Sequence, residues 1–204
     1  MELETILTKI KRHTPKILGS ERFSKYAILL PLLQKEDGIH VLFEVRSLEL
    51  RSQPGEICFP GGKIDSQDLD EKDAAIRETV EELGIIKEEI TEIYPLDYMI
   101  SPFGMILYPF VGYINRPDEI QPNPMEVGEI FTVPLTYLIK NSPEIYRIHF
   151  KAVPERDFPY DLIPGGEKYN WRTRESEEYF YRYGDRAIWG LTARILAHFI
   201  EMIR

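Results

Sequence analysis

This sequence of 204 residues has a single cysteine, no long apolar run and no excess of basic residues. Cys58 is the single cysteine, which rules out an intrachain disulfide and a zinc site built from cysteines. The longest apolar run, residues 26–33, is far too short to span a bilayer. This cysteine usage fits a reducing compartment, and we expect a buried, inert thiol at Cys58 rather than a nucleophile.

Positive charge is scarce, because 25 Lys and Arg residues stand against 34 Asp and Glu residues and give a formal net charge of −9. General binding to nucleic acid or to an anionic membrane depends on basic side chains that neutralise phosphates. We therefore expect neither a nucleic-acid partner nor a membrane partner. Phosphate chemistry stays open, because bound divalent cations can reverse the local charge.

We expect neither a signal peptide nor a peroxisomal address from the ends of this sequence. Residues 1–13 lack a basic segment followed by an apolar one, so we expect no signal peptide. The apolar residues there have the spacing of an amphipathic helix instead: Leu3, Ile6, Leu7 and Ile10. The C-terminal sequence EMIR is not a peroxisomal address. We expect a soluble, cytoplasmic protein.

One domain spanning residues 1–204 is the expectation for this length, with 43% hydrophobic residues available for a core. We expect residues 1–22 to form a helical N-terminal extension, and residues 142–184 to be an insertion or a hairpin. The pattern as a whole mixes strands with few helices, which predicts an α+β sandwich.

Strands and helices are expected where apolar residues recur with the matching period. Residues 26–33 and 39–45 form a predicted hairpin around Glu36-Asp37-Gly38, and the second strand alternates as if only one face were buried. A short strand at 57–59 leads into a predicted turn at Pro60-Gly61-Gly62. Further strands are expected at 92–98, 107–114, 149–153 and 179–183, and further helices at 71–83, 135–140 and 191–202.

The predicted helix 71–83 carries acidic and apolar residues on opposite sides, between a suitable N-cap at Asp70 and a suitable C-terminal glycine at Gly84. At about 100° per residue, Glu78, Glu81 and Glu82 share an arc of about 100°. The apolar residues occupy an arc of about 60° on the other side: Ile76, Val80 and Leu83. The apolar stripe would dock on the sheet and leave the carboxylates facing outward.

This acidic face has two interpretations. It is an ordinary solvated face if the glutamates only favour the helix, since like charges four residues apart cost only about 0.2–0.5 kcal/mol. It is a cation site if Arg77 holds Glu81 in position and the Gly61-Gly62 pair brings backbone carbonyls close to an ion. Mg²⁺ takes oxygen ligands from a few carboxylates, phosphates and water, and such ions can bridge a diphosphate and activate water.

The segment from Gly62 to Ile85 resembles the Nudix box, G-x5-E-x7-R-E-U-x-E-E-x-G-U, in which U is an aliphatic residue. The half from Arg77 to Ile85, RETVEELGI, matches at every fixed position, with Thr79 in place of an aliphatic residue. The distance from Gly62 to Arg77 is one residue longer than in the box. Leu69 stands where glutamate is expected, and it is flanked by aspartates.

The longer spacing and the aspartate-rich segment resemble the coenzyme A pyrophosphatase-like subfamily, whose upstream signature is L-L-T/S-x-R-S-x3-R-x3-G-x3-F-P-G-G. Here the sequence LFEVRS at residues 42–47 is followed at the same spacings by Arg51, Gly55 and FPGG at 59–62. Only Phe43 and Glu44 depart from the preferred residue types. The resemblance covers residues 26–140 and 185–200.

This resemblance implies a Nudix-type α/β/α sandwich with a mixed central sheet and with Mg²⁺ or Mn²⁺ held by Glu78 and Glu82. Glu81 would be a further ligand or the catalytic base. The base could instead come from a later loop, where Glu126 and Glu129 are candidates. The alternative for both loop residues is that they are surface acids flanking a strand.

Substrate binding is assigned to Arg46 and Arg51, and to the backbone at Gly61 and Gly62. Arginine suits bidentate recognition of a 3′-phosphate or a diphosphate, although salt bridges to nearby acids are the alternative. Arg77 is interpreted as a residue that orients the carboxylates. Trp189 and Tyr183 could stack on adenine, but packing in the core is the more common role of such aromatics.

The implied function is metal-dependent hydrolysis of the diphosphate of coenzyme A, or of its thioester or oxidised forms. The products would be 4′-phosphopantetheine, or its acyl form, and adenosine 3′,5′-bisphosphate. The alternatives are a Nudix pyrophosphatase for ADP-ribose or another nucleoside diphosphate derivative, and a non-catalytic Nudix-fold binding module. The intact Arg-Glu-x-x-Glu-Glu pattern argues against the binding module. Frequent dimerisation in the family favours a homodimer.

Overall fold

Helices α1–α4 and strands β1–β11 make up the regular structure of the computed structural model, which describes residues 2–204. The helices are α1 (Leu3–Lys11), α2 (Glu71–Leu83), α3 (Leu135–Lys140) and α4 (Gly190–Ile203). The strands are β1 (Ser24–Lys35), β2 (Gly38–Arg46), β3 (Ile57–Cys58), β4 (Gly61–Lys63), β5 (Ile90–Pro95), β6 (Met99–Ser101), β7 (Met105–Ile114), β8 (Val127–Pro134), β9 (Glu144–Phe150), β10 (Arg174–Tyr183) and β11 (Arg186–Trp189).

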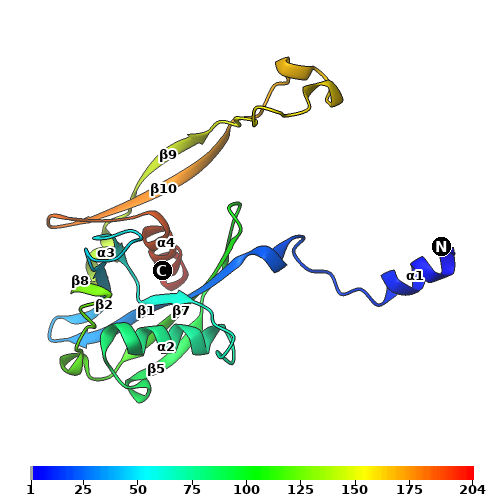
Figure 1. Cartoon of the computed structure of the whole chain (residues 1–204). Coiled ribbons are helices and arrows are strands. Elements are labelled where there is room, and N and C mark those ends of the chain that lie inside the picture. Colours follow the sequence, from blue (N-terminus) through cyan, green and yellow to red (C-terminus); the bar gives the residue numbers. More distant parts are fainter. Residues whose placement is uncertain (1) are drawn as a thin grey trace.

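The body of the molecule is a mixed sheet with helices on both faces (Figure 1). Its main path runs β3-β2-β1-β7-β5, while β4 pairs with β1, β6 with β7 and β8 with β2. β1 and β7 are parallel, and the other pairs in this sheet are antiparallel. α2 covers one face, and α4 lies on the other. The expected α+β fold, an α/β/α sandwich with a mixed central sheet, is confirmed.

Two hydrophobic clusters fill the spaces between the sheet and these helices. The cluster on the α2 side includes Leu29, Leu42, Ala75 and Leu83. The cluster on the α4 side includes Leu30, Val41, Phe43, Leu196 and Ile200. Successive residues of a strand point to opposite faces, so β1 and β2 supply apolar side chains to both clusters.

The predicted exposed face of residues 39–45 is therefore wrong. His40, Leu42 and Glu44, the residues that alternate with the apolar set, are all buried. The reason is that β2 lies inside the sheet, with β1 and β3 along one edge and β8 along the other, and has helices over both faces. The hairpin itself is confirmed by the pairing of Lys35 with Gly38.

The predicted helices agree with α1, α2, α3 and α4, and the ends of α2 match their sequence signals. The Asp70 side chain accepts a hydrogen bond of 2.8 Å from the backbone N–H of Asp73. Gly84 ends the helix in the left-handed conformation, with φ at 62°. A substituted Cβ there would also lie 2.0 Å from the carbonyl oxygen of Gln121, so glycine is required by both conformation and space.

The predicted turn at Pro60-Gly61-Gly62 is wrong, because both glycines belong to β4 and pair with β1. Gly61 lies so close to β1 that a Cβ would come within 2.4 Å of the carbonyl oxygen of Ala27. Strands β6, β8 and β11 were not predicted from the sequence. Close strand packing, and not a turn, explains the glycine at position 61.

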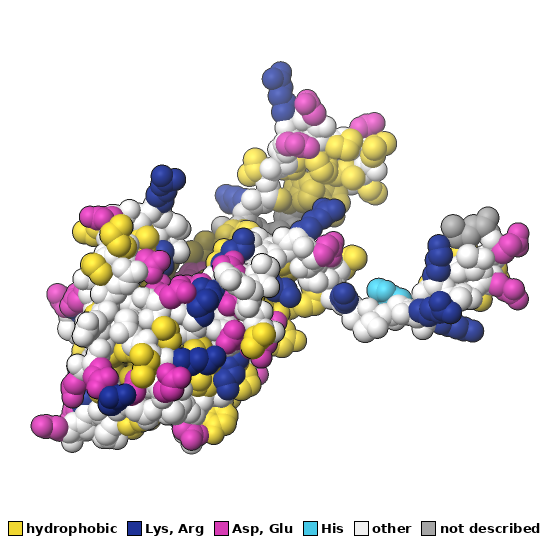
Figure 2. Space-filling view, turned by 60° about the horizontal axis from the view of Figure 1, so that its bottom comes forward, with side chains coloured by type: hydrophobic (Ala, Val, Ile, Leu, Met, Phe, Trp, Pro, Cys, Tyr) yellow, Lys and Arg dark blue, Asp and Glu magenta, His cyan; other side chains and the backbone are white. Residues whose placement is uncertain are grey.

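Residues 144–183 form an arm that extends away from the body (Figure 1). β9 and β10 are its long antiparallel strands, and β11 completes a separate three-stranded sheet. Every residue of β9 is exposed. Beyond the strands, Phe158, Tyr160, Tyr169 and Trp171 pack on one another, and Figure 2 shows hydrophobic side chains gathered over this far end.

α1 also lies away from the body and buries none of its residues (Figure 1). Within residues 2–204, no helix has the length and apolar character needed to cross a membrane. The division into a single domain with extensions stays a prediction.

Candidate active site

Glu82 is buried at the end of α2, where it faces the glycine strand β4. Its side chain accepts a 2.7 Å hydrogen bond at Oε2 from the backbone N–H of Gly61. Only 7% of the residue is exposed, so the prediction that all three glutamates face outward is wrong for Glu82. The buried side of α2 is wider than its aliphatic stripe and extends through Ala75 and Thr79 to Glu82.

Glu78 lies one turn earlier on α2 and is half-buried against Gly62. A Cβ at Gly62 would lie 2.4 Å from the Glu78 carboxyl carbon, so the glycine leaves the space that this carboxylate fills. Gly61 thus donates to Glu82, and Gly62 makes room for Glu78. The close-packed pair of glycines positions both predicted metal ligands.

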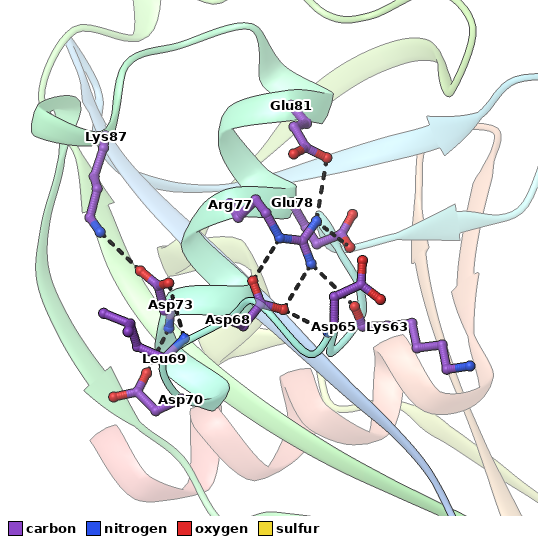
Figure 3. Close-up of polar contacts among 10 residues, drawn as sticks. All are labelled: Lys63, Asp65, Asp68, Leu69, Asp70, Asp73, Arg77, Glu78, Glu81 and Lys87. Atoms are coloured by element: carbon purple, nitrogen blue, oxygen red, sulfur yellow. Dashed lines mark hydrogen bonds and ion pairs between the residues drawn. The ribbon is translucent and has the colours of Figure 1, made fainter.

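Arg77 holds the outer part of the site together (Figure 3). Its guanidinium donates to Asp68 through Nε at 2.8 Å and through a terminal nitrogen at 3.1 Å. It also donates to Glu78 at 2.9 Å and, over 3.4 Å, to Glu81. The orienting role expected of Arg77 is supported by these contacts. Glu81 remains the most exposed of the three helix carboxylates, with 53% of its side chain accessible.

Asp68, and not the residue at the box position, provides the carboxylate that meets Arg77. Leu69 is 89% exposed, whereas the Asp68 side chain is only 2% accessible beneath the guanidinium. Hydrogen bonds from Arg77 lower the pKa of Asp68 below its ordinary value. The extra residue between Gly62 and Arg77 is accommodated in this loop, and the acidic partner of the arginine is kept.

Burial raises the pKa of the carboxylates nearest the sheet. The pKa of Glu82 rises to about 8, chiefly because burial disfavours the charged form, while the N–H of Gly61 opposes the shift. The nearby charges of Glu78 and Glu126 raise it further. Burial also raises the pKa of Glu78, with Arg77 acting in the opposite direction. Several negative charges therefore lie together in a poorly solvated region, with few positive charges or hydrogen-bond donors to balance them.

The loop before β8 brings Glu126 to this region. The backbone N–H groups of Gln121 and Asn123 donate to the carbonyls of Leu83 and Glu82, each at 2.9 Å, and so tie the loop to the end of α2. Glu126 accepts a 3.1 Å hydrogen bond from the Asn123 side chain. Its charge is close enough to raise the pKa of Glu78 and of Glu82.

Glu129, the other loop candidate for the base, lies on β8 opposite Val45 and forms a 2.6 Å ion pair with Arg186. The guanidinium of Arg186 also stacks on the ring of Phe131, 4.2 Å from its centroid. Glu126 and Glu129 therefore have different surroundings. The structure brings Glu126 to the helix carboxylates and gives Glu129 a cationic partner of its own.

Arg46 ends β2 beside the carboxylates, and its positive charge lowers the pKa of both Glu44 and Glu82. Its Nε donates to the carbonyl of Ser52 over 3.4 Å, across the loop that joins β2 to β3. Arg51 is exposed on that loop. One arginine of the upstream signature thus adjoins the carboxylates, and the other projects from a neighbouring loop.

Trp189 is not the core residue that its type suggested, because 41% of it is exposed. It stacks on Phe180 and lines an open cavity of 450 Å³. Ile57, which also lines this cavity, packs with the cluster on the α4 side of the sheet, whereas Glu82 lies on the α2 side. Tyr183 packs against Tyr137 at the edge of the α4-side cluster. The structure does not bring these aromatics to the carboxylates.

Cys58 lies opposite Glu44 in the β2–β3 pair. Burial, together with the charges of Glu44 and Glu82, raises the pKa of its thiol to about 12. A thiol with so high a pKa is protonated near neutral pH and is a poor nucleophile. This agrees with the inert role expected from the sequence.

Glu44 is the site residue that the sequence interpretation missed, since the alternating pattern placed it on a solvent face. It is only 1% exposed, and burial raises its pKa well above the ordinary value, with a further increase from Glu82. The available signal was Leu42, which shares its face of β2. An aliphatic residue two positions away indicated that this face is buried as well.

The donor chemistry of these residues fits a divalent cation. The charges of Glu82 and Glu126 raise the pKa of Glu44, the charges of Glu78 and Glu126 raise the pKa of Glu82, and both Glu44 and Glu82 are buried. One oxygen of Glu44 is buried with no hydrogen-bond partner among residues 2–204. Within the same residues, no three acidic or histidine side chains form a preassembled metal cage. Oxygen ligands and uncompensated negative charge are nevertheless the features that Mg²⁺ and Mn²⁺ require.

Several known proteins are similar in sequence to this chain over most of its body. A family model described as the NUDIX domain matches residues 24–155. The mouse peroxisomal coenzyme A diphosphatase NUDT7 is 37% identical over 135 residues, which cover 66% of this chain and 56% of the mouse protein. The Caenorhabditis elegans peroxisomal coenzyme A diphosphatase ndx-8 is 32% identical over 150 residues, covering 64% of this chain and 61% of that protein.

A bacterial relative extends the similarity over a larger share of both chains. The Nudix hydrolase NudL of Photorhabdus laumondii is 30% identical over 178 residues, which cover 87% of this chain and 84% of that protein. By contrast, the chain spans little more than half the length of the mouse relative.

Proposed function

This chain belongs to the Nudix hydrolase family, and we propose that it hydrolyses the diphosphate of coenzyme A or of one of its thioester or oxidised forms. The products would be 4′-phosphopantetheine, or its acyl form, and adenosine 3′,5′-bisphosphate. The observation that carries this proposal is the position of Arg46, which comes from the coenzyme A-type signature and adjoins the carboxylates of the Nudix box. Two relatives named as coenzyme A diphosphatases support the same substrate class.

The carboxylates of Glu78 and Glu82 would hold Mg²⁺ or Mn²⁺. A bound divalent ion supplies positive charge for the diphosphate and lowers the pKa of bound water. Gly61 holds Glu82 in place through its N–H, Gly62 leaves room for Glu78, and Arg77 keeps Glu78 oriented. Because these contacts exist before substrate arrives, the site is organised for electrostatic stabilisation in advance.

Glu126 is the residue that we propose as general base. It lies on a loop tied to the end of α2, and it faces the helix carboxylates without a cationic partner among the hydrogen bonds of residues 2–204. A general base must lie within reach of the attacking water, and the negative charge of Glu126 lies close enough to act on Glu78 and Glu82. Glu81 is the alternative, as a base or as a further ligand, but its carboxylate is exposed and contacts Arg77.

Arg46 and Arg51 would bind the substrate phosphates, because guanidinium groups pair with phosphate oxygens in a bidentate manner. Arg46 adjoins the carboxylates and is the candidate for the diphosphate. Arg51 is exposed on the adjoining loop and is the candidate for the 3′-phosphate.

The substrate assignment is tested by comparing turnover of coenzyme A, 3′-dephospho-coenzyme A and ADP-ribose in Mg²⁺. Coenzyme A should have the highest kcat/KM. Arg51→Gln should raise KM for coenzyme A and leave KM for 3′-dephospho-coenzyme A unchanged, and Arg147→Gln on the exposed arm is the matched control. Preference for ADP-ribose would replace coenzyme A as the substrate, and ligand binding without hydrolysis of any nucleotide would favour a binding module.

A cytoplasmic location and a homodimer stay predictions that accompany this function. Light scattering during size-exclusion chromatography measures the second directly, and a mass of twice 23.9 kDa would support it. A single-chain mass at micromolar concentration would contradict it.

A further inference from the structure

Glu44 is a buried carboxylate with an unpartnered oxygen among residues 2–204. It occupies an inner strand of the sheet, opposite Cys58 on β3 and Ile130 on β8. It is 1% exposed, and its Oε1 is buried without a hydrogen-bond partner among the described residues. Burial of a charged or polar group without compensation is costly, so such an oxygen calls for an explanation.

The direction of the Glu44 side chain follows from its neighbours on β2. Phe43 packs in the cluster on the α4 side, and Leu42 packs in the cluster on the α2 side. Strand side chains alternate, so Glu44 points to the α2 side with Leu42. That side holds the buried Glu82, whose other contact is the N–H of Gly61.

The groups facing Glu44 are two carboxylates and one guanidinium. The charges of Glu82 and Glu126 act on it from the end of α2 and from the loop before β8, and Arg46 acts from its own strand. No hydrogen bond or ion pair joins Glu44 to Arg46 within residues 2–204, where Arg46 donates to Ser52 instead. The charges of two acids thus act on the Glu44 carboxylate, and within residues 2–204 the nearby arginine makes no hydrogen bond to it.

Chemistry favours a cation at this point over a purely structural role. An apolar residue of similar size would fill an inner strand without a desolvation penalty. A hard divalent ion satisfies several carboxylate oxygens at once and removes the repulsion among them. Glu44 is also a position at which the chain departs from the coenzyme A-type signature, which prefers Thr or Ser there.

We propose that Glu44 is a further carboxylate ligand of the divalent cation site, acting with Glu78 and Glu82. The proposal rests on the proposed function for the existence of that site. It adds a ligand from the sheet to ligands that otherwise come from one helix. A ligand on β2 would fix the ion relative to Arg46, two residues along the same strand, and hence relative to the substrate diphosphate.

Mn²⁺ binding to the full chain without substrate tests the proposal, with free Mn²⁺ measured by electron paramagnetic resonance. Glu44→Gln keeps the size of the side chain and removes its charge. We expect it to weaken Mn²⁺ binding by about tenfold or more, or to remove one bound ion per chain. Glu129→Gln, which alters an acid already paired with Arg186, is the control and should bind Mn²⁺ as the wild type does.

A structural role would give a different result. Glu44→Gln would then lower the melting temperature of the metal-free protein and leave Mn²⁺ affinity unchanged, which would overturn the proposal. Glu44→Thr, which restores the residue type of the signature, is the second variant if Glu44→Gln does not fold, and the same loss of Mn²⁺ binding is expected. A wild-type chain that binds no Mn²⁺ would also overturn it.

The proposed function can fail separately from this inference. Mn²⁺ binding that depends on Glu44, in a protein that does not hydrolyse coenzyme A, would keep the ligand assignment and reject the substrate. Hydrolysis of coenzyme A with unchanged Mn²⁺ binding by Glu44→Gln would keep the substrate and reject the ligand.

Discussion

The α2 side of the sheet and the β9–β10 arm differ in which side chains they bury and which they expose. On the α2 side, the carboxylates of Glu44 and Glu82 are buried, with 1% and 7% of each residue exposed. On the arm, Ile145, Ile148 and Phe150 are 50%, 45% and 38% exposed. Charge is buried in the body, and apolar surface is exposed in the arm.

This contrast shows that the buried carboxylates of the body are better explained by ligand binding than by stability of the fold. Buried carboxylates destabilise a folded chain unless a cation or hydrogen bonds compensate them, so their presence in the body points to ligand binding. The sheet beneath them is covered on both faces and can bear that cost. The arm has no such cover, and most of its apolar side chains add little to the stability of the body.

We expect the largest difference in stability between variants on the two edge strands of the small three-stranded sheet, β11 and β9. Ile188 on β11 is fully buried against the body, and Ile148 on β9 is exposed. Ile188→Ala should lower the free energy of unfolding by about 2–5 kcal/mol, because it leaves a cavity. Ile148→Ala should change it by no more than about 0.5 kcal/mol. Urea denaturation measures both, and equal losses would show that the arm is as important to stability as the body.

An intermediate effect is expected where α2 meets the loop that carries Glu126. Gly84 and Gly184 have φ of 62° and 61°, but only at Gly84 would a Cβ meet a backbone oxygen, 2.0 Å away. Alanine at either position incurs the left-handed penalty of about 1–2 kcal/mol. Gly84→Ala should lower the free energy of unfolding by about 1–3 kcal/mol more than Gly184→Ala does, because the loop before β8 must move to admit the new Cβ.

The same pair of glycine variants also tests the site. Movement of the loop in Gly84→Ala should displace Glu126 and reduce kcat, whereas Gly184→Ala on the β10–β11 turn should keep it. Equal stability losses in the two variants would contradict the close contact between α2 and the loop.

The smallest effect concerns the pH dependence that Asp68 adds to stability. Its pKa is lower in the folded protein than in the unfolded chain, because Arg77 donates hydrogen bonds to it. The stability from this pair is therefore present above the unfolded pKa of about 3.9 and is lost as the pH falls through the folded value.

Asp68→Asn should therefore lower the melting temperature by about 2–5 °C at pH 7 and by less below pH 4. Thermal unfolding monitored by circular dichroism across this range measures the difference. A constant difference at every pH would mean that the charge of Asp68 contributes nothing.

Local signals in the sequence were sufficient for the helices and for the motif. The sequence predicts α2 together with its N-cap at Asp70 and its C-terminal glycine at Gly84, because these features depend on residues close together in the chain. The burial of Glu82 was not readable, because it depends on the close approach of Gly61 from β4. The burial of Glu44 had a local signal in Leu42, which shares its face of β2 and packs in the cluster on the α2 side, but the alternation of apolar and polar residues pointed the other way.

The segment 142–184 shows the other limit of sequence reasoning. Its strands β9 and β10 pair with each other, but most of their residues remain exposed, so the usual alternation of apolar and polar residues is weak there. The sequence shows that Asp68 is next to the box position. That Arg77 binds Asp68 depends on how the loop folds against α2, which the sequence does not show.

We propose that the buried carboxylate of Glu82 serves a metal-dependent attack on the diphosphate of coenzyme A. It is tested most directly by the rate of coenzyme A hydrolysis in Mg²⁺ and ¹⁸O-water, with products identified by mass, for the wild type, Glu82→Gln and the control Glu129→Gln. We predict that the wild type and the control release 4′-phosphopantetheine and adenosine 3′,5′-bisphosphate, one of them carrying ¹⁸O, and that Glu82→Gln is slower by on the order of 10²–10³-fold. Full activity of Glu82→Gln on coenzyme A would contradict the account.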